Sequence, residues 1–552
     1  MATMNNTKKK VARSVTKDTK TTRNHHGTTV HKLNALEELF SKVLGSLFGE
    51  STAYEKRTAE GDYKKLCSLI GDVEDEDIEY VLKIARLGRE YNMIQYPLAV
   101  LTACMNDDRF KGEDFIDENT GKNKLQSYSH YIIRRGKDIL DILATQMNVY
   151  GFTTKGRGKK KHRETPLPMQ MRKTLKGKLE SFNEYQLSKA LGESKEVSMA
   201  DAIKLLHPNP VKSRVGRDFY RDIIEGNVKM GADSLQVQSE IAKVNNKNSK
   251  TTKKDVVKSI DTSTVMAIIK NLVALERQGI FEDKKAVDKI VAKLTDKKEV
   301  QKSRLLPFRF YSAYKEVSKM RTSVGKRRVL DALVEALDLS IDNLPDITGY
   351  SAILIDKSGS MDYNVSSMSS VTAKELACLL GAICFKKGIA DVYVFADRCA
   401  MIDKISKKST TMDIVNELLR HYVGGCTNID TAIDSIRKSG TKYDNLIILS
   451  DNDCYSSNGS TFKLGRGYYS NYKTYSADED INTLIKKGII KKVYVNNLLG
   501  NKFAIINTDD YRKNLITGFS ERIVEVINTY SSIGTGANDI RVVIDSLMDN
   551  LQ

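Results

Sequence analysis

The fold is decided by the stretch Ser351-Ala-Ile-Leu-Ile355, followed at once by Asp356-Lys-Ser358-Gly-Ser360-Met361. An apolar run of this length is typical of a buried strand, and here it ends in Asp-x-Ser-x-Ser. The ending places one carboxylate and two compact hydroxyls at a single point, and hard divalent cations prefer such oxygen ligands. Gly359 lets the loop turn tightly enough for both hydroxyls to point inward. The stretch therefore predicts a strand that ends in a cation site.

Two segments further along the chain strengthen this prediction. Gly424-Gly-Cys-Thr427-Asn428 precedes a helix-like segment, and Leu446-Ile-Ile-Leu-Ser-Asp451 is a second apolar strand that ends in an aspartate. Parallel strands present their carboxyl ends at one edge of a sheet, which is where open α/β folds bind ligands. Together the segments bring five oxygen-bearing side chains to that edge. The alternative reading is that these Ser and Asp residues only cap turns and helices.

The residues around the motif alternate between strand and helix patterns. Strands are expected at 352–355, 391–395, 445–449 and 491–496, and helices at 371–387, 412–421, 429–438, 521–528 and 538–551. Such alternation indicates a mostly parallel, doubly wound (Rossmann-like) α/β domain over residues 346–552. The segment 338–345 is the expected hinge into it, and 455–478 is an expected long loop.

This region resembles a von Willebrand factor A domain with a metal-ion-dependent adhesion site. The resemblance implies that Asp356, Ser358, Ser360, Thr427 and Asp451 hold the metal, the last often through water. Mg²⁺ is the expected cation. The family leaves one coordination position for a carboxylate of a protein partner, so the resemblance also implies a docking site.

Residues 31–345 have a helical pattern, with apolar residues at helical spacing from Leu33 onward and almost no strand signal. Many short amphipathic helices with short connections predict an α solenoid of HEAT-like helix pairs, although no repeat of fixed period is found. Residues 1–30 are polar, basic and aperiodic, and are expected to be a disordered tail.

Several segments of the helical half are similar to the TROVE module of the Ro autoantigen family. They are Tyr185–Lys189, Val197–Pro208, Met266–Ile280 and Arg304–Ala313, and their order, with the metal motif behind them, matches that family over residues 30–552. The resemblance implies a ring of helical repeats closed by the von Willebrand domain. It also implies binding of small structured non-coding (Y) RNA and of misfolded or single-stranded RNA ends in a ribonucleoprotein.

The expected RNA surface centres on one basic helix that begins at Met169. Arg172, Lys173 and Lys176 lie close together at helical spacing and rank first as phosphate contacts. Further candidates are Lys178, Lys189, Lys204 and His207, and the aromatic residues Tyr128, Tyr131, Phe182 and Tyr185 are candidates for base stacking. Met199 stands where the family commonly has a polar, RNA-facing histidine, so the grip on RNA is expected to differ there.

Composition narrows the classes of protein. The net charge is +18, from 88 Lys and Arg against 70 Asp and Glu, and the excess gathers in the first 23 residues, at 155–163 and at 245–254. Such patches favour a polyanionic partner, with a merely solvated lysine-rich surface as the alternative. Seven scattered cysteines, no Cys-x-x-Cys pair and no apolar leader favour a reduced, cytoplasmic protein without a membrane span.

No catalytic constellation stands out, so we expect a binding protein and no enzyme. The sequence has no Walker loop or nucleophile elbow, and no histidine is placed to activate Ser358 or Ser360. Three functions remain open. The first is a Ro-type RNA-binding protein that also docks a protein partner, such as an RNA-processing enzyme. The second is a protein-interaction scaffold whose metal site binds an acidic partner. The third is a metal-dependent RNA-processing enzyme.

Overall fold

The computed structural model describes most of the chain. Its described residues are 20–24, 28–51, 56–111, 115–118, 121–151, 153–155, 162–164, 167–191, 196–210, 218–228, 253–367, 369–454, 477–498, 500–518 and 522–551. The sequence expectations for the basic segments at 1–19 and 245–252, for 156–161, and for nearly all of the 455–478 loop lie outside these residues.

The first half of the chain is a series of helices, as the apolar spacing indicates. Its first arm contains α1 (Ala35–Gly45), α2 (Ala59–Gly71), α3 (Ile78–Glu90), α4 (Gln95–Asn106), α5 (Lys124–Ile132), α6 (Gly136–Tyr150), α7 (Met169–Glu180), α8 (Glu184–Ser188), α9 (Met199–Leu206) and α10 (Phe219–Ile224). Its second arm contains α12 (Lys253–Thr262), α13 (Val265–Arg277), α14 (Lys284–Thr295), α15 (Lys297–Ser303), α16 (Pro307–Ser318) and α17 (Val324–Ile341). A small hairpin of β3 (Thr153–Lys155) and β4 (His162–Glu164) follows α6.

Local sequence fixes where these helices begin. At α1 the Asn34 side chain accepts from the Glu37 amide while the Glu37 side chain accepts from the Asn34 amide, which is a complete capping box. Ser198 and Asp201 form another capping box at α9, and Pro307 occupies the first turn of α16. The buried faces of both arms join one hydrophobic core cluster that extends into the α/β domain.

The second half is an α/β domain built on a six-stranded sheet in the order β11-β9-β8-β5-β6-β7. The strands are β5 (Tyr350–Asp356), β6 (Ile389–Phe395), β7 (Cys399–Met401), β8 (Tyr443–Ser450), β9 (Ile490–Asn497) and β11 (Lys513–Thr517). All neighbours pair in parallel except β7, which is antiparallel to β6. The helices are α18 (Ala373–Lys387), α19 (Thr411–Arg420), α20 (Ile429–Ser439), α21 (Ala477–Lys486), α22 (Ile523–Ile533) and α23 (Ile540–Asp549).

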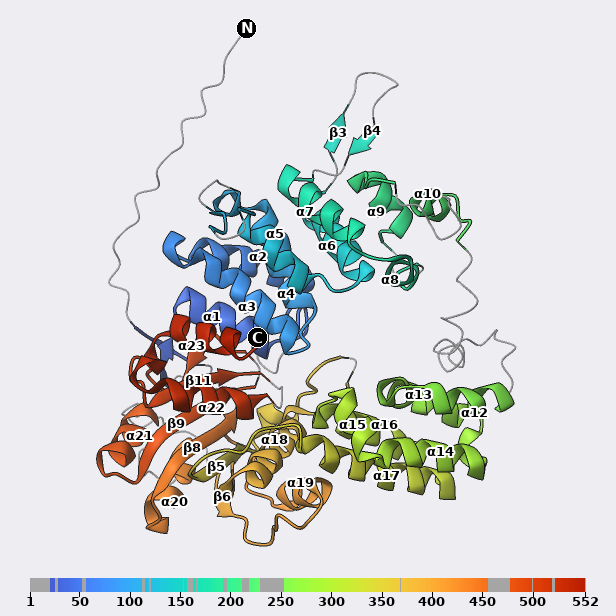
Figure 1. Ribbon diagram of the computed structural model, residues 1–552. Coiled ribbons are helices and arrows are strands. Elements are labelled where there is room, and N and C mark those ends of the chain that lie inside the picture. Colours follow the sequence, from blue (N-terminus) through green and yellow to red (C-terminus); the bar gives the residue numbers. More distant parts are fainter. Residues whose placement is uncertain are drawn as a thin grey trace, which may run out of the picture.

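The two arms and the α/β domain make a ring of helical repeats plus a doubly wound domain, the fold class that the sequence predicts. Figure 1 shows the arms curving away from the α/β domain, which lies between α1 at one end of the helical series and α17 at the other. Side chains join both junctions. Tyr80 and Lys83 of α3 bind Asp545 of α23 at 2.8 Å and 2.6 Å, and Lys315 of α16 binds Glu375 of α18 at 2.5 Å.

Part of the expected disordered tail is ordered, so that expectation is wrong for residues 20–24 and 28–30. β1 (Thr21–Arg23) and β2 (Thr29–Lys32) form a hairpin, and β2 also pairs with β10 (Phe503–Ala504) of the α/β domain. The physical reason is tertiary packing on the α/β domain. Val30 and Leu33 are buried in a separate hydrophobic cluster of the α/β domain, together with Phe503 and Ala504, and the local sequence does not show these distant partners.

Two smaller expectations also need correction. The segment 338–345 does not begin as a hinge, because α17 continues to Ile341 and Ala336 and Leu337 remain buried at its end. The sheet has a further strand, β11, and a short antiparallel edge strand, β7, that the sequence pattern did not single out. No helix within the described ranges is long and apolar enough to cross a membrane.

Candidate functional site

The predicted metal residues meet at the carboxyl edge of the sheet. β5 and β8 are parallel neighbours with Ile355 opposite Leu449, so Asp356 and Ser450 emerge side by side. The Ser450 hydroxyl donates to Asp356 Oδ2 at 2.7 Å, and the Ser358 amide donates to Asp356 Oδ1 at 2.9 Å. Asp356 is therefore held by its own loop and by the neighbouring strand.

The loop that carries Thr427 is fastened to the Asp-x-Ser-x-Ser loop. The Gly359 amide donates to the Gly425 carbonyl at 2.8 Å, and the amides of Gly425 and Cys426 donate to the Asp397 carboxylate at 2.9 Å and 3.2 Å. Gly424 has φ +106°, and a Cβ there would lie 2.1 Å from Asp397 Oδ2, so only glycine fits. Thr427 is buried in this loop, with 2% of its surface exposed.

The remaining donors show the chemistry expected of a cation site. The hydroxyls of Ser358 and Ser360 lie 3.1 Å apart. Asp451 Oδ2 and both amide atoms of the Asn452 side chain are buried without a hydrogen-bond partner. Uncompensated buried oxygen atoms are costly, and a divalent cation with its bound water would satisfy the oxygens among them. The residues present therefore fit a hard cation such as Mg²⁺.

Electrostatics of the pair of carboxylates support the same fit. Burial raises the pKa of Asp356, and burial together with the charge of Asp356 raises the pKa of Asp451 to about 7. Two buried carboxylates in one place repel each other, and a bound cation would relieve that repulsion. In the described part of the chain no three His, Cys, Asp or Glu side chains form a metal cluster. A cation here would thus depend on serine and threonine hydroxyls and on water.

Sequence reasoning missed three residues that support this edge. Ser450 orients Asp356, and Asn501 donates to the Asp451 carbonyl at 2.6 Å. Lys357, inside the motif itself, is only 6% exposed, and its ammonium group donates to carbonyls in the last turn of α19. The sequence could have indicated the role of Lys357, because this lysine stands between two residues that were expected to be buried.

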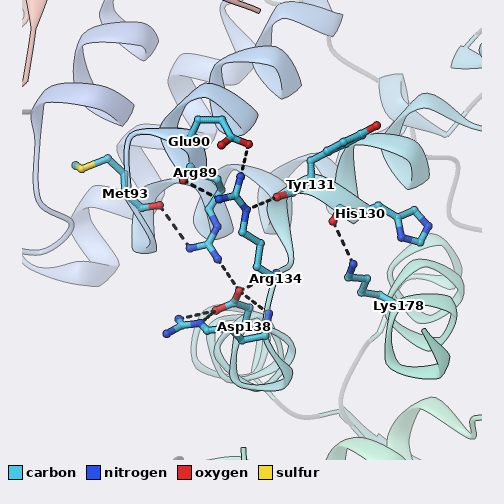
Figure 2. Close-up of polar contacts among 9 residues, drawn as sticks. Arg89, Glu90, Met93, His130, Tyr131, Arg134, Asp138 and Lys178 are labelled. Carbon is cyan, nitrogen blue, oxygen red and sulfur yellow. Dashed lines mark hydrogen bonds and ion pairs between the residues drawn. The ribbon is translucent and has the colours of Figure 1, made fainter. Parts of the chain in front are cut away.

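The expected RNA contacts on α7 differ in how exposed they are and in whether they already have a partner in the protein. Lys173 is exposed and Arg172 is half-buried, whereas Lys176 lies 4.0 Å from Glu180 in an i,i+4 ion pair. Lys178 donates to the His130 carbonyl at 3.1 Å and lies over the Phe182 ring, and burial lowers its pKa (Figure 2). Lys178 therefore mainly stabilises the packing of α7 against its neighbours and is a weaker candidate for RNA contact.

The other candidates lie on neighbouring helices. Lys189 lies over the Tyr185 ring at 4.1 Å, and Lys204 and His207 are exposed at the end of α9. His207 ends α9 in the left-handed conformation, at φ 49°. Met199, in place of a polar residue, is 2% exposed and packs in the core. No RNA-facing group is present at that position.

Among the aromatic candidates, Tyr131 has the surface that stacking needs. It is 49% exposed, and the Arg86 guanidinium lies 3.8 Å from its ring centroid. Phe182 is buried and so is no stacking surface, and the Tyr128 hydroxyl donates to Glu79 at 3.0 Å.

A buried ion pair holds the turn between α5 and α6. Asp138 is fully buried and accepts from Arg89 Nη2 at 2.7 Å, from Arg135 Nη2 at 2.7 Å and from the amides of Arg134 and Arg135 (Figure 2). Arg134 is fixed as well, because it donates to Tyr131 O at 3.0 Å and to Glu90. This network places Arg135 at the rim of a large cavity.

That cavity has a volume of about 890 Å³ and lies between the two helical arms and the α/β domain. Basic residues Arg135, Lys137, Arg304 and Arg309 line it together with the acidic Asp141 and Glu316, and Phe48 and Phe308 add half-buried rings. Ser366 and Ser369, a few residues beyond the metal motif, complete one wall. The sequence showed these residues only as scattered charges.

Comparisons with known proteins agree with this architecture. The TROVE domain family matches residues 258–342. The RNA-binding protein RO60 of Caenorhabditis elegans is 26% identical over 275 residues, which are 48% of this chain and 39% of the nematode protein. The crystal structure of the Deinococcus radiodurans RO (RSR) protein superimposes with a TM-score of 0.58 at 16% identity, covering 93% of this chain and 99% of that one.

The fold and the site thus define a ring of helical repeats with a von Willebrand factor A-like domain between its ends. Within that class, the TROVE match over residues 258–342 and the sequence similarity to RO60 relate the chain to the Ro autoantigen family.

Proposed function

We propose that the protein binds RNA, holding a small structured non-coding RNA on its basic helices and a single-stranded RNA end in the cavity. The observation that carries this proposal is the lining of the cavity. Exposed Arg304 and Arg309 and half-buried Phe48 and Phe308 combine cations with aromatic faces. Grooves that hold single strands without reading sequence use this combination.

The outer surface suits the folded part of an RNA. Lys173, Lys189 and Lys204 are exposed on helices α7 to α9 or directly after one of them, and Tyr131 is 49% exposed. Phosphate contacts from such residues position a structured RNA by its shape. RO60, which shares sequence with this chain, carries the name of an RNA-binding protein, and this supports the same role here.

We further propose that Asp356, Ser358, Ser360, Thr427 and Asp451 hold Mg²⁺ and that the metal edge docks an acidic protein partner, such as an RNA-processing enzyme. The buried, unpartnered Oδ2 of Asp451 favours a cation at this place. When bound, the cation would supply a Lewis-acidic position for a carboxylate ligand. The chain's own residues orient the ligands through Ser450 and exclude bulk water by burial.

Filter binding with two RNAs tests the RNA proposal. One is a hairpin with a single-stranded 3′ tail and the other is the same hairpin with a blunt end. Lys137 and Arg309 line the cavity and have no ion-pair partner in the described ranges. Alanine at both positions should weaken binding of the tailed RNA about 10-fold and leave the blunt RNA little changed.

The matched control removes the same charge elsewhere. Lys284→Ala with Lys285→Ala, on the exposed first turn of α14, should leave both affinities unchanged. If both RNAs bind weakly and no variant matters, the RNA proposal is wrong and the scaffold function is favoured. Mg²⁺-dependent cleavage that is lost with Asp356→Ala would instead favour the enzyme.

A further inference from the structure

Helix α19 connects the helical ring to the candidate metal site. It runs from Thr411 to Arg420, and the eight residues after it form the loop that ends in Thr427 and Asn428. Along its length α19 packs on α18 and on α17, the last helix of the helical half. Side chains from two different parts of the chain hold its two ends.

Lys357 holds the carboxyl end of α19. Its ammonium group donates to the Leu418 carbonyl at 2.7 Å, to the Leu419 carbonyl at 2.9 Å and to the His421 carbonyl. The last carbonyls of a helix have no partner within the helix and carry a partial negative charge, so a cation there is stabilising. Because Lys357 lies between Asp356 and Ser358, this cap ties the metal motif to the start of the Thr427 loop.

Asp338 of α17 holds the opposite end of α19. Its carboxylate accepts from the Thr411 amide at 3.1 Å and from the Thr411 hydroxyl, and Lys386 of α18 binds the same oxygen at 2.8 Å. A carboxylate at a helix amino end is stabilised by the unpaired amides. The helical half therefore contributes an acceptor at the amino end of α19, in addition to Thr410, whose side chain accepts from the Asp413 amide.

We propose that Lys357 is a positioning residue of the metal site, and that α19, capped by Lys357 and Asp338, couples metal affinity to the seating of the helical ring on the α/β domain. The inference rests on the proposed metal binding. The cap fixes the point where α19 passes into the loop with Thr427, so loss of either cap releases that loop. The coupling is reciprocal, because metal binding then favours the capped position of α19.

The direction in which metal affinity changes in a Lys357 variant distinguishes a positioning role of this lysine from a purely electrostatic effect of its charge. Mn²⁺ and Mg²⁺ affinities of the full chain are measured by calorimetry for Lys357→Met, which removes a nearby positive charge. If charge alone matters, cation binding becomes tighter. Positioning requires weaker binding, by about 10-fold or more, as for other residues that orient metal ligands. Lys374→Met removes another nearby cation, paired with Asp362 at 2.7 Å, and serves as the charge control.

Asp338→Asn tests the other end of α19, far from the ligands, and also covers the case in which Lys357→Met does not fold. It should weaken Mn²⁺ binding about 5-fold, and in the unsubstituted protein Mn²⁺ should slow amide hydrogen exchange in α19. Unchanged affinity in both variants, with the parent protein binding Mn²⁺, overturns the coupling alone. Absence of Mn²⁺ binding by the parent overturns the proposed metal site itself.

Discussion

At the scale of single residues, the proposed metal site depends most on the buried carboxylates of Asp356 and Asp451. Oδ2 of Asp451 has no hydrogen-bond partner, and burial raises the pKa of this residue. Asp451→Asn should therefore leave the metal-free protein as stable as before, or more so, because it removes an uncompensated buried charge. The same change should abolish the stabilisation by Mg²⁺, which is about 2.7 kcal/mol at 100 times Kd.

Thermal unfolding with Mg²⁺ and with EDTA measures both effects. Asp403→Asn, at an exposed position outside the site, is the control and should keep the full Mg²⁺ effect. A variant that loses stability without metal yet keeps the Mg²⁺ effect would contradict the assignment of Asp451.

A second prediction at this scale concerns the network around Asp138. Its carboxylate is fully buried and neutralises Arg89, whose side chain is 5% exposed. Asp138→Ala leaves that guanidinium buried without its partner, so we expect a loss of about 3–5 kcal/mol in the free energy of unfolding. Denaturant titration measures the loss. Asp108→Ala removes an ion pair whose carboxylate is 96% exposed and should leave the midpoint nearly unchanged.

At the scale of elements, β2 ties the first residues of the helical half to the α/β domain. His31 faces Ala504 in the pairing with β10 and lies 3.7 Å from Asp478, which binds Lys513 at 2.7 Å. Burial lowers the pKa of His31, although Asp478 and Asp509 act against this and Lys513 adds to it. The unfolded state then binds more protons than the native state, and stability falls as the pH falls below about 6.5.

Unfolding temperatures at pH values on both sides of 6.5 test this dependence. His31→Gln should flatten the decline, and His207→Asn, at an exposed helix end, should leave it as it is. A decline of equal size in His31→Gln would show that other groups cause it.

Strand ends and helix starts were largely predictable from sequence, because both have local causes. An apolar run followed by Asp-x-Ser-x-Ser located β5 and the side chains proposed as metal ligands, and parallel pairing with β8 then brings Asp356 and Asp451 to one edge. Lys357 shows where such reasoning ends. Its role depends on α19, more than sixty residues away, and no local pattern states that two such segments meet.

At the scale of the whole molecule, the α/β domain joins the two arms of the helical series. Ser367, just after the metal motif, donates to Glu50 between α1 and α2, and Ser370 donates to Glu316 of α16. One short segment thus contacts both arms and borders the cavity. The cavity could not be foreseen from sequence, because residues near positions 48, 135, 309 and 366 meet only when the ring is complete.

We propose that the basic helices and the cavity hold RNA by its phosphates. The most direct test is the affinity for the tailed hairpin between about 50 and 200 mM salt. For the unsubstituted protein we expect the logarithm of the affinity to fall linearly with the logarithm of the salt concentration. Alanine at Arg172, Lys173 and Lys176 should lower the magnitude of that slope by about two to three. An affinity that changes neither with salt concentration nor in the triple alanine variant would contradict phosphate binding by these residues.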